Sequence, residues 1–362
     1  MQRQHDASLV WLDLRLPVRR RSGQRVMLRP WEVTDGHDTD PVVAVETGHH
    51  LVDRGAEFLL LALLQLAMPP EGERDWAALW HEPPSPEALE RALSPYRPAL
   101  DLLHPTHPAL QVRPSAAALA EIAKPARKGA RVAAAAEDGE DDGAESLAIE
   151  NLIPGCASKN DTDQKKNKNK DIFAKRGEVR SLHAALALPL LYAQIVLFPA
   201  GGGGHFLLPH GSGSVKFLLV SDTLWRTLWL NVLPWGNGRL AKENWDPSPT
   251  RQGRMAPLDR RVFAWLHPAL PRISLKKEGS KAPRVGITAA EIHAAGIPMQ
   301  RRYLLEAPEE GRCDLCGETG PVFRRFVRWP GGLDYKDSGW MPLIVAQVPK
   351  RGKAVKPGER VL

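Results

Sequence analysis

An apolar segment over residues 51–68 limits the possible folds of this chain more than any other part of the sequence. The segment predicts a helix with apolar residues on nearly every side, which is typical of a helix buried in a core. Pro69 and Pro70 are expected to end it, because proline lacks the backbone N–H that would continue the helix. The longest apolar run, residues 58–68, is too short to cross a bilayer. We therefore expect a buried helix and no membrane partner.

The composition fits a loop-rich globular protein. The chain has 362 residues, 43% hydrophobic and 25% charged, with 32 prolines and 30 glycines, so one large core or two smaller ones can form. The 49 Lys and Arg against 42 Asp and Glu leave a net charge of +7, which favours an anionic partner or simply keeps the protein soluble. The polar residues 1–6 lack a secretory signal, and the odd count of 3 cysteines fits a reducing compartment. We expect a cytoplasmic protein.

Helix and strand signals are mixed along the chain and predict an α+β fold, a loop-rich single large domain over residues 1–362. Strands are expected over residues 11–18 and 24–28, which form a hairpin around the basic turn 19–23. A further buried strand is expected over residues 215–220.

Several helices have readable ends. Ser85 followed by Pro86 predicts a helix start, because the hydroxyl can cap and proline suits the first turn. Residues 179–198 are apolar and helical, with a kink expected at Pro189. Shorter helices are expected over residues 223–233, with Ser221 or Asp222 as caps and tryptophans in the core, and from the capping box of Thr288 and Glu291 to Gly296.

A charged stretch interrupts this pattern. Residues 124–170 begin basic, pass through alanines, turn acidic at 137–142 and end in a lysine and asparagine tract at 164–170. Such a composition cannot bury enough apolar surface to offset the entropy of ordering it. We therefore expect a mobile charged insertion over residues 124–176.

Four consecutive glycines, Gly201, Gly202, Gly203 and Gly204, follow the second apolar helix and precede Phe206. Without Cβ atoms, the backbone can take positive φ and another molecule can approach its amides closely. This pattern indicates either a flexible surface loop or a binding loop.

Common catalytic signatures are missing from the sequence. It has no phosphate-binding loop, dinucleotide fingerprint, nucleophile elbow or His-Glu-x-x-His pair. His104 and His107 are each followed by proline, so we interpret them as turn residues rather than metal ligands. The sequence therefore gives no sign of these four kinds of catalytic site.

Cys313 and Cys316 form a Cys-x-x-Cys turn, which supplies half of a tetrahedral zinc site. Further ligands are needed, and Cys156 or His183 are the candidates. The sequence suggests no cofactor other than a structural zinc here, and the alternative is a turn without metal.

The order of these segments is more specific than any one of them. The chain resembles the large subunit of the type I-E CRISPR surveillance complex Cascade, the CasA family, over nearly its whole length. The resemblance is carried by the strand at residues 11–18, His107 to Gln111, the helix at 182–194 leading to the glycines, residues 222–233, 263–268, and 297–305 before the Cys-x-x-Cys turn.

This resemblance implies a non-enzymatic subunit that senses the protospacer-adjacent motif, or PAM, in double-stranded target DNA and assists opening of the duplex. The glycine loop of the family aligns with Gly201, Gly202, Gly203 and Gly204, and a bare backbone can enter a narrow minor groove. The implied partners are target DNA, the 5′ end of the guide RNA, neighbouring Cascade subunits, and a helicase-nuclease or a nuclease-bearing companion subunit.

Two further family elements contact nucleic acid. A family loop corresponds to part of residues 159–176, where the candidate contacts are Lys165, Lys166, Lys168, Asn169, Lys170 and Phe173. A family lysine lies after the cysteine turn, where Arg324, Arg328 or Lys336 are candidates. Alternation along a strand would put Arg324, Phe326 and Arg328 on one face.

The sequence departs from the family in two ways. Relatives continue into a wedge hairpin and a C-terminal four-helix bundle, whereas this sequence stops at Leu362, so we expect an N-terminal PAM-recognition domain without the bundle. Some relatives also carry a second Cys-x-x-Cys in the mobile loop, where only Cys156 stands here. Two other functions stay open: a metal-dependent nuclease or other hydrolase, and a structural interaction module without direct DNA contact.

Overall fold

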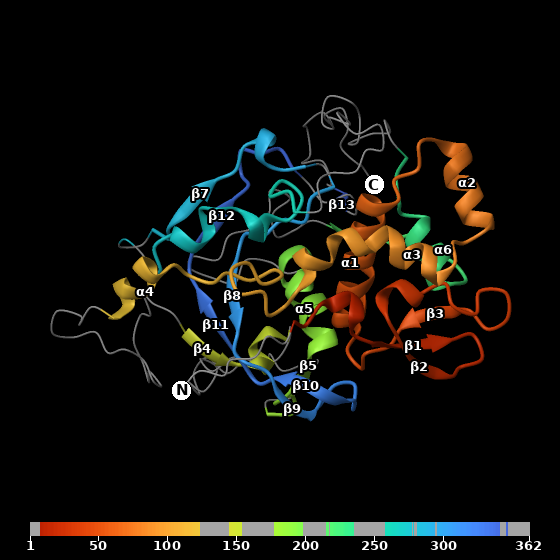
Figure 1. Ribbon diagram of the computed structural model, residues 1–362, viewed down its shortest axis with the longest axis horizontal. Helices are drawn as coiled ribbons and strands as arrows, with labels where there is room; N and C mark the ends of the chain where they lie inside the picture. Colours follow the sequence, from red (N-terminus) through yellow and green to blue (C-terminus); the bar gives the residue numbers. More distant parts are fainter. Residues whose placement is uncertain are drawn as a thin grey trace.

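The computed structural model describes residues 8–123, 145–153, 177–197, 215–216, 218–234, 258–276, 278, 281–293, 295–340 and 345–346. Within these ranges, helices and short strands are mixed and the strands form small separate sheets (Figure 1). The predicted α+β class is therefore confirmed. Every helix in the described ranges is too short or too polar to span a bilayer.

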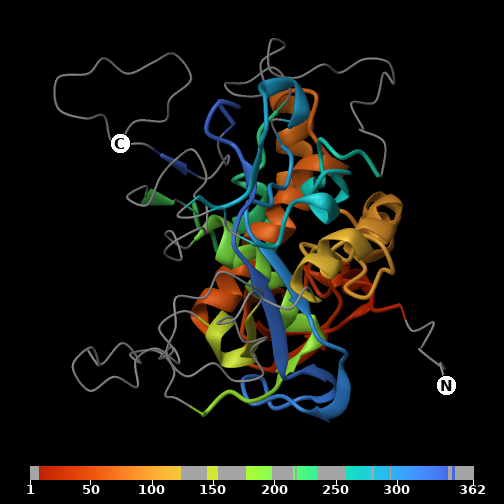
Figure 2. The same cartoon turned by 90° about the vertical axis from the view of Figure 1, so that its left-hand side faces the viewer.

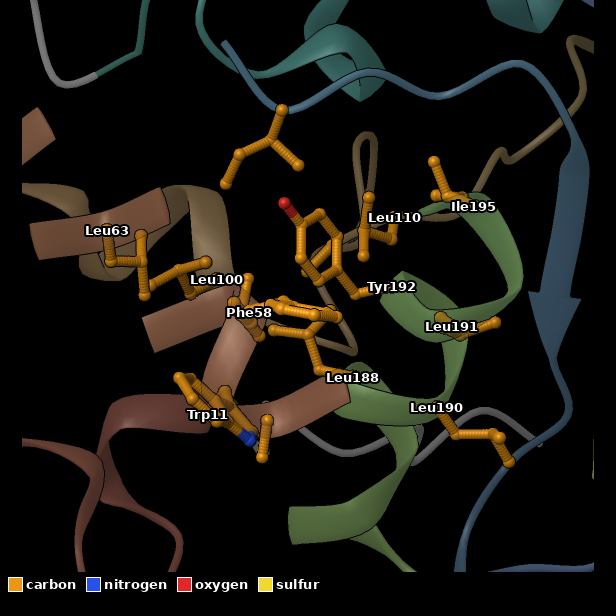
Figure 3. Close-up of a cluster of buried hydrophobic side chains, with 14 of the residues drawn as sticks. Trp11, Phe58, Leu63, Leu100, Leu110, Leu188, Leu190, Leu191, Tyr192 and Ile195 are labelled. Atoms are coloured by element: carbon orange, nitrogen blue, oxygen red, sulfur yellow. The ribbon is translucent and has the colours of Figure 1, made fainter. Parts of the chain in front are cut away.

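Two apolar helices form the centre of the fold. The expected buried helix is α1 (His50–Ala67), which ends before Pro69 as predicted, and it packs against α5 (Ala184–Val196) (Figures 1 and 3). Gly55 permits their close approach, because a Cβ there would lie 2.3 Å from the carbonyl oxygen of Pro189. Most residues of both helices are buried in the main cluster of apolar side chains, which is the favourable term in folding.

Trp11 contributes a specific bond to this helix pair. Pro189 has no N–H to donate to Ala185, four residues earlier in α5. The buried indole N–H of Trp11 donates to that carbonyl instead, at 2.9 Å. Figure 3 shows the Trp11 side chain within the apolar cluster. Trp11 lies in the 3-10 helix η1 (Trp11–Asp13), so the predicted strand over residues 11–18 was wrong in its first half, where the indole is turned into the core.

The N-terminal hairpin is confirmed. Strands β1 (Leu16–Arg20) and β2 (Arg25–Leu28) pair antiparallel around the basic turn. On its other side β1 pairs with β3 (Val42–Val45), which gives the order β2-β1-β3.

Two more sheets hold the second half of the chain. One has the order β4-β11-β8, with β4 (Glu145–Ala148), β11 (Arg325–Trp329) and β8 (Arg302–Leu305) antiparallel. The other has the order β5-β10-β9, with β5 (Leu182–His183), β10 (Thr319–Phe323) and β9 (Glu309–Arg312). The β9–β10 hairpin lies at one end of the molecule (Figures 1 and 2).

The remaining elements are short and surround these units. The α-helices are α2 (Glu73–His81), α3 (Pro86–Leu93), α4 (Ala116–Ala123) and α6 (Leu224–Trp229). The 3-10 helices are η2 (Pro30–Glu32), η3 (Ser94–Leu100), η4 (Ile149–Leu152), η7 (Ala264–Leu266), η8 (Leu270–Arg272) and η9 (Ala289–Glu291). Strand β7 (Arg284–Gly286) pairs with β12 (Gly332–Asp334), and β6 (Val215–Lys216) with β13 (Val345–Ala346).

Two of the three helix-cap predictions were right. Ser85 Oγ accepts from the N–H of Ala88, and the Thr288–Glu291 capping box forms. For α6 the predicted caps Ser221 and Asp222 were wrong, because Thr223 Oγ1 accepts from Arg226 instead. The buried, stacked Trp225 and Trp229 confirm that the tryptophans of this helix belong to the core.

Several predicted boundaries were too long. Leu182 and His183 pair with β10 before α5 begins, so residues 179–183 are not helical. In the described part of the expected strand 215–220, only Val215–Lys216 pairs with another strand. The helix after Thr288 ends at Glu291 rather than at Gly296. His104 and His107 stack in a turn, as expected.

Part of the predicted mobile insertion is ordered. Within residues 124–176, the structure places β4 and η4 against the core, with Leu147, Ile149, Leu152 and Ile153 buried. These apolar side chains offset the ordering entropy that the surrounding charged composition cannot. The prediction was therefore wrong for residues 145–153.

Candidate nucleic-acid interface

The residues predicted to contact nucleic acid divide into two groups. Outside the described residues lie Gly201, Gly202, Gly203, Gly204, Lys165, Lys166, Lys168, Asn169, Lys170 and Phe173, together with the candidate zinc ligand Cys156. Inside them lie Arg324, Arg328 and Lys336, together with the candidate zinc ligands Cys313, Cys316 and His183. The structure does describe the chain on both sides of the lysine segment and before the glycine segment, and hydrogen bonds join these three flanks.

Helix η4 is where the flanking residues meet. It follows β4 directly, and its residues Ile149 and Leu152 are buried in the main core. Glu150 projects toward the residues that follow the lysine segment, and its Oε2 accepts from the N–H of Gly177 at 2.7 Å. The two described ends that border residues 154–176 are therefore joined by one carboxylate.

Gln194 joins the same helix to α5, which leads into the glycines. Its Nε2 donates to the carbonyl of Leu152, and its Oε1 accepts from Arg301 Nη1 at 3.3 Å. The neighbouring Gln300 donates to the carbonyl of Ile195 at 3.1 Å. We call residues 149–152, with Gly177, Gln194 and Arg301, the η4 junction.

Arg324 is connected to this junction through its backbone. Its carbonyl accepts from the N–H of Ile149 at 2.8 Å. The side chain is exposed and pairs with Glu309, which leaves the guanidinium at the surface but partly neutralised. Because backbone pairing changes partner here, β10 ends at Phe323 and β11 starts at Arg325. The prediction of one continuous strand through Arg324 was therefore wrong.

Arg325, on the opposite side of this break, was not among the candidates. Its Nη2 donates to the carbonyl and hydroxyl oxygens of Ser146 at 3.0 and 2.9 Å, and its Nε lies 3.7 Å from Glu306. These bonds fix β4 to β11, so the role the structure gives Arg325 is structural.

Arg328 and Lys336 occupy different surroundings. Arg328 is half-buried in β11, where its register partners are Tyr303 in β8 and Glu145 in β4. Lys336 is exposed after β12, on the two-stranded β12–β7 sheet, and its N–H donates to Asp334. The structure therefore joins only Arg324 of these three directly to the η4 junction, through its carbonyl. Arg328 pairs with the end of β4 that is away from η4, and Lys336 follows a strand of a separate sheet.

The cysteine turn connects β9 and β10 and is fastened to the rest of the fold by its middle residues. Asp314 Oδ2 accepts from the N–H groups of Arg180 and Ser181, and the N–H of Asp314 donates to the carbonyl of Ser181. Burial opposes ionisation of Asp314, but these hydrogen bonds lower its pKa overall. The cysteine turn is therefore hydrogen-bonded to Arg180 and Ser181, shortly after the described chain resumes at Gly177.

The described residues do not complete a zinc site at this turn. Cys313 and Cys316 are buried and hydrogen-bonded to each other, which lowers the pKa of Cys313 and raises that of Cys316. His183 Nδ1 caps α5 by accepting from Ala185, and Gly320 lies against its Nε2. Among the residues that the structure describes, no group of three or more His, Cys, Asp or Glu side chains is placed to hold a metal ion. Zinc at this turn stays a prediction.

Sequence reasoning missed the residues that build the η4 junction. Glu150 and Gln194 belong to no motif, and their partners are distant in sequence: Leu152 and Gln194 are 42 positions apart, and Gln194 and Arg301 are 107. One signal was available, because Gln194 is the only amide in the otherwise apolar α5. A lone amide near the end of a buried helix is expected to have buried partners.

Comparisons with known proteins agree with this fold. A family model described as CRISPR-associated protein Cse1 matches residues 15–359. Among solved structures, Thermobifida fusca Cse1 is similar with a TM-score of 0.52 at 17% identity, covering 91% of this chain and 52% of that one. A chain of a CRISPR RNA-guided surveillance complex has a TM-score of 0.50 at 18% identity, covering 97% and 62%. Cse1 from Acidimicrobium ferrooxidans has 0.49 at 20%, covering 92% and 54%.

These structural likenesses are of fold alone, since every identity is low. The chain spans about half the length of the solved structures that it matches. A search of curated proteins gave no match. Cse1 is the protein also called CasA, so the resemblance found in the sequence is confirmed. Because the family match extends over nearly the whole chain, this protein belongs to the Cse1 family of CRISPR-associated proteins.

Proposed function

We propose that this protein is the PAM-sensing subunit of a type I-E Cascade complex. It binds double-stranded target DNA with the glycine segment 201–204 and the lysine segment 165–170, and assists the start of R-loop formation. It performs no chemistry itself. Its other partners are the 5′ end of the guide RNA, neighbouring Cascade subunits, and a helicase-nuclease or nuclease-bearing companion.

One observation carries this proposal. The η4 junction holds together the chain before and after the lysine segment and the helix that leads into the glycines. Arg324, a third predicted contact, bonds to the same short helix through its carbonyl. The described chain next to these segments, far apart in the sequence, is therefore joined at one place, which supports a single binding surface.

The chemistry of the two segments suits a duplex. The minor groove is narrow and shows few distinguishing donors and acceptors, so a backbone without side chains can enter it and read it loosely. Lysines beside it would bind phosphates and release counterions. Because the glycine backbone reads few distinguishing groups and the lysines bind phosphates of any sequence, PAM recognition should be promiscuous.

The test uses the reconstituted complex with guide RNA and a duplex library in which the motif beside the target is randomised. Gly202→Val with Gly203→Val is expected to weaken binding of the preferred duplexes about tenfold, or ~1.4 kcal/mol, and to leave assembly with the guide RNA unchanged. Gly72→Val is the matched control, because a Cβ at Gly72 meets no atom within 4 Å. Unchanged motif-dependent binding in the glycine variant would refute the proposal.

Two other outcomes separate the alternative functions. Cleavage of the duplex by the isolated chain, abolished by a chelator, would identify a metal-dependent nuclease. A purely structural module would bind the complex without adding to its salt dependence, whereas phosphate contacts give a steep dependence on salt.

A further inference from the structure

We propose that a groove between α2 and α3 binds a short amphipathic helix of a partner protein, one with an apolar face and a basic flank. The groove has a volume of about 460 Å³ and lies at the surface where α1 ends. The residues that line it all belong to the described chain. The inference holds whether or not the chain binds DNA, since α2 and β4 lie on opposite sides of the molecule (Figure 1).

The groove exists because α2 is fastened on one side, to α6. Trp76 Nε1 donates to the carbonyl of Trp229 at 3.2 Å, and Trp229 Nε1 donates back to the carbonyl of Trp76 at 2.8 Å. Trp225 Nε1 donates to the carbonyl of Leu79 at 3.0 Å. These bonds hold α2 in place although none of its residues is buried. The space on its other side, toward α3, stays open as the groove.

The floor of the groove is apolar. It is formed by Met68 at the end of α1, Leu79 of α2, and Ala88 and Ala92, which lie one turn apart on α3. These four side chains are half-buried, so part of their apolar surface still meets water. Covering that surface with the apolar side chains of a partner is favourable. The alanines are short, which leaves room for larger side chains of the partner to reach the floor.

The rim of the groove is charged, and its two walls carry opposite signs. Glu71 and Asp75 are exposed on the α2 side, and Arg91 is exposed on the α3 side. Among the described residues, neither carboxylate has an ion-pair partner, so both are available to a cation. The carbonyl end of α1 adds partial negative charge.

These charges decide the kind of occupant. A basic flank that lies against α2 gains two attractive contacts, whereas the phosphates of a nucleic acid would be repelled there. Helix α3 has 8 residues and is therefore about 12 Å long, so a partner helix can lie beside it for about two turns. An apolar helix face in an apolar groove is a common mode of peptide recognition. The geometry therefore fits a protein segment with lysine or arginine on the flank that faces α2.

The test uses the full chain and three synthetic peptides of about 15 residues, the length at which isolated helices begin to form. The peptides share one leucine face and carry lysine, glutamine or glutamate at the polar positions. We expect the lysine peptide to bind about tenfold tighter than the glutamate peptide, with the glutamine peptide between them. Equal binding of the lysine and glutamate peptides, or binding of none of the three, would overturn the inference.

A matched pair of variants separates contact at the groove from general attraction. Asp75→Lys and Glu73→Lys each replace an exposed carboxylate in the first turn of α2, so both disturb the helix dipole alike. Only Asp75 lines the groove. Asp75→Lys is expected to weaken binding of the lysine peptide about fivefold and Glu73→Lys less than twofold. Equal losses in the two variants would overturn the inference.

The opposite wall gives a test of opposite sign. Arg91→Glu removes a positive charge from the rim and adds a negative one. It is expected to strengthen binding of the lysine peptide about threefold or more. Weaker binding in this variant would contradict the proposed orientation, in which the basic flank faces α2.

Filling the groove tests its location without changing charge. Ala92→Phe places a ring over the floor and is expected to weaken all three peptides, whereas Ala78→Phe, exposed on α2 and outside the groove, is expected to bind them as wild type. Wild-type binding by Ala92→Phe would place the peptides elsewhere and overturn the inference. Sedimentation of the chain alone should show a monomer. A dimer that Ala92→Phe dissociates would make a second copy the occupant and would also overturn it.

Discussion

The α1–α5 pair and the η4 junction join distant parts of the chain by opposite means. In the helix pair, buried apolar side chains pack together (Figure 3), and Gly55 lets the backbones approach closely at Pro189. At the η4 junction, a carboxylate, an amide and a guanidinium make a few directed bonds. Apolar contact is roughly proportional to area and has little direction, whereas hydrogen bonds fail outside a narrow geometry.

The two regions should therefore contribute differently: the helix pair to the stability of the fold, and the η4 junction to the relative position of the segments that it joins. We expect changes in the α1–α5 pair to alter the free energy of unfolding of the whole fold. Changes at the η4 junction should alter local order and binding, with little effect on global unfolding. The following predictions test that division.

The largest effect is expected for Gly55→Val. A Cβ at Gly55 would lie 2.3 Å from the Pro189 oxygen and 3.0 Å from Ala193 Cβ, and since the first is backbone, the helices must separate. The free energy of unfolding should fall by about 3 kcal/mol, measured by urea denaturation. Gly72→Val, which meets no neighbour, should stay within about 0.5 kcal/mol of wild type. Equal stability of the two variants would show that the pair is not closely packed at Gly55.

A pH-dependent effect of up to about 3 kcal/mol is expected at Glu57, the buried carboxylate of α1. Burial raises its pKa from 4.5 to about 7, Asp53 adds to the rise, and Arg54, 2.5 Å away, opposes it. The folded state therefore binds the proton more tightly than the unfolded state. Its stabilising contribution is complete below pH 4.5 and is lost as the pH rises through 7.

Glu57→Gln removes this dependence. Relative to wild type, the variant should gain stability between pH 4 and pH 8 by about 2 to 3 kcal/mol, because an amide stays neutral throughout. Urea denaturation of both proteins at each pH measures the difference, and shared titrations cancel. A difference that does not change with pH would mean that Glu57 ionises normally in the folded protein.

The bond from Trp11 to the Ala185 carbonyl should be worth about 1 kcal/mol. Trp11→Phe leaves that carbonyl without a donor, since Pro189 cannot supply one. In a Pro189→Ala background the helix itself can donate, so Trp11→Phe should cost less there. A double-mutant cycle, with the free energy of unfolding measured in urea, separates the contribution of the hydrogen bond from the effect of losing indole volume. Zero coupling would mean that the indole contributes only packing.

The sequence was informative where contacts are local or apolar. The length and apolar character of α1 follow from residues 51–68 themselves, and the Ser85 cap and the Thr288–Glu291 box join residues three apart. Such features depend on neighbours along the chain, so pattern reasoning reaches them.

Long-range polar contacts were beyond the sequence. Trp11 reads as a strand residue until its partner, 174 positions away, is known. Residues 145–153 were assigned to a mobile insertion because charged stretches surround them, although Leu147, Ile149, Leu152 and Ile153 are buried. Of the candidate site, Arg324 and Arg328 could be proposed from the family resemblance and the alternation of a strand. The η4 junction depends on Glu150 and Gln194, whose partners no local pattern indicates.

The smallest change in global stability is expected for a substitution at Glu150. Its effect should be confined to the neighbourhood of Gly177. Glu150→Ala removes the acceptor of the Gly177 N–H, and since Gly177 is only half-buried, water can replace the bond. The free energy of unfolding should fall by less than about 1 kcal/mol. Hydrogen exchange at the Gly177 amide should accelerate about fivefold or more, while amides within α1 keep their wild-type rates, because the bond closes a local opening rather than the global one. Acceleration in α1 as well would show that the η4 junction and the helix pair unfold as one unit, and the division between stability and position would not hold.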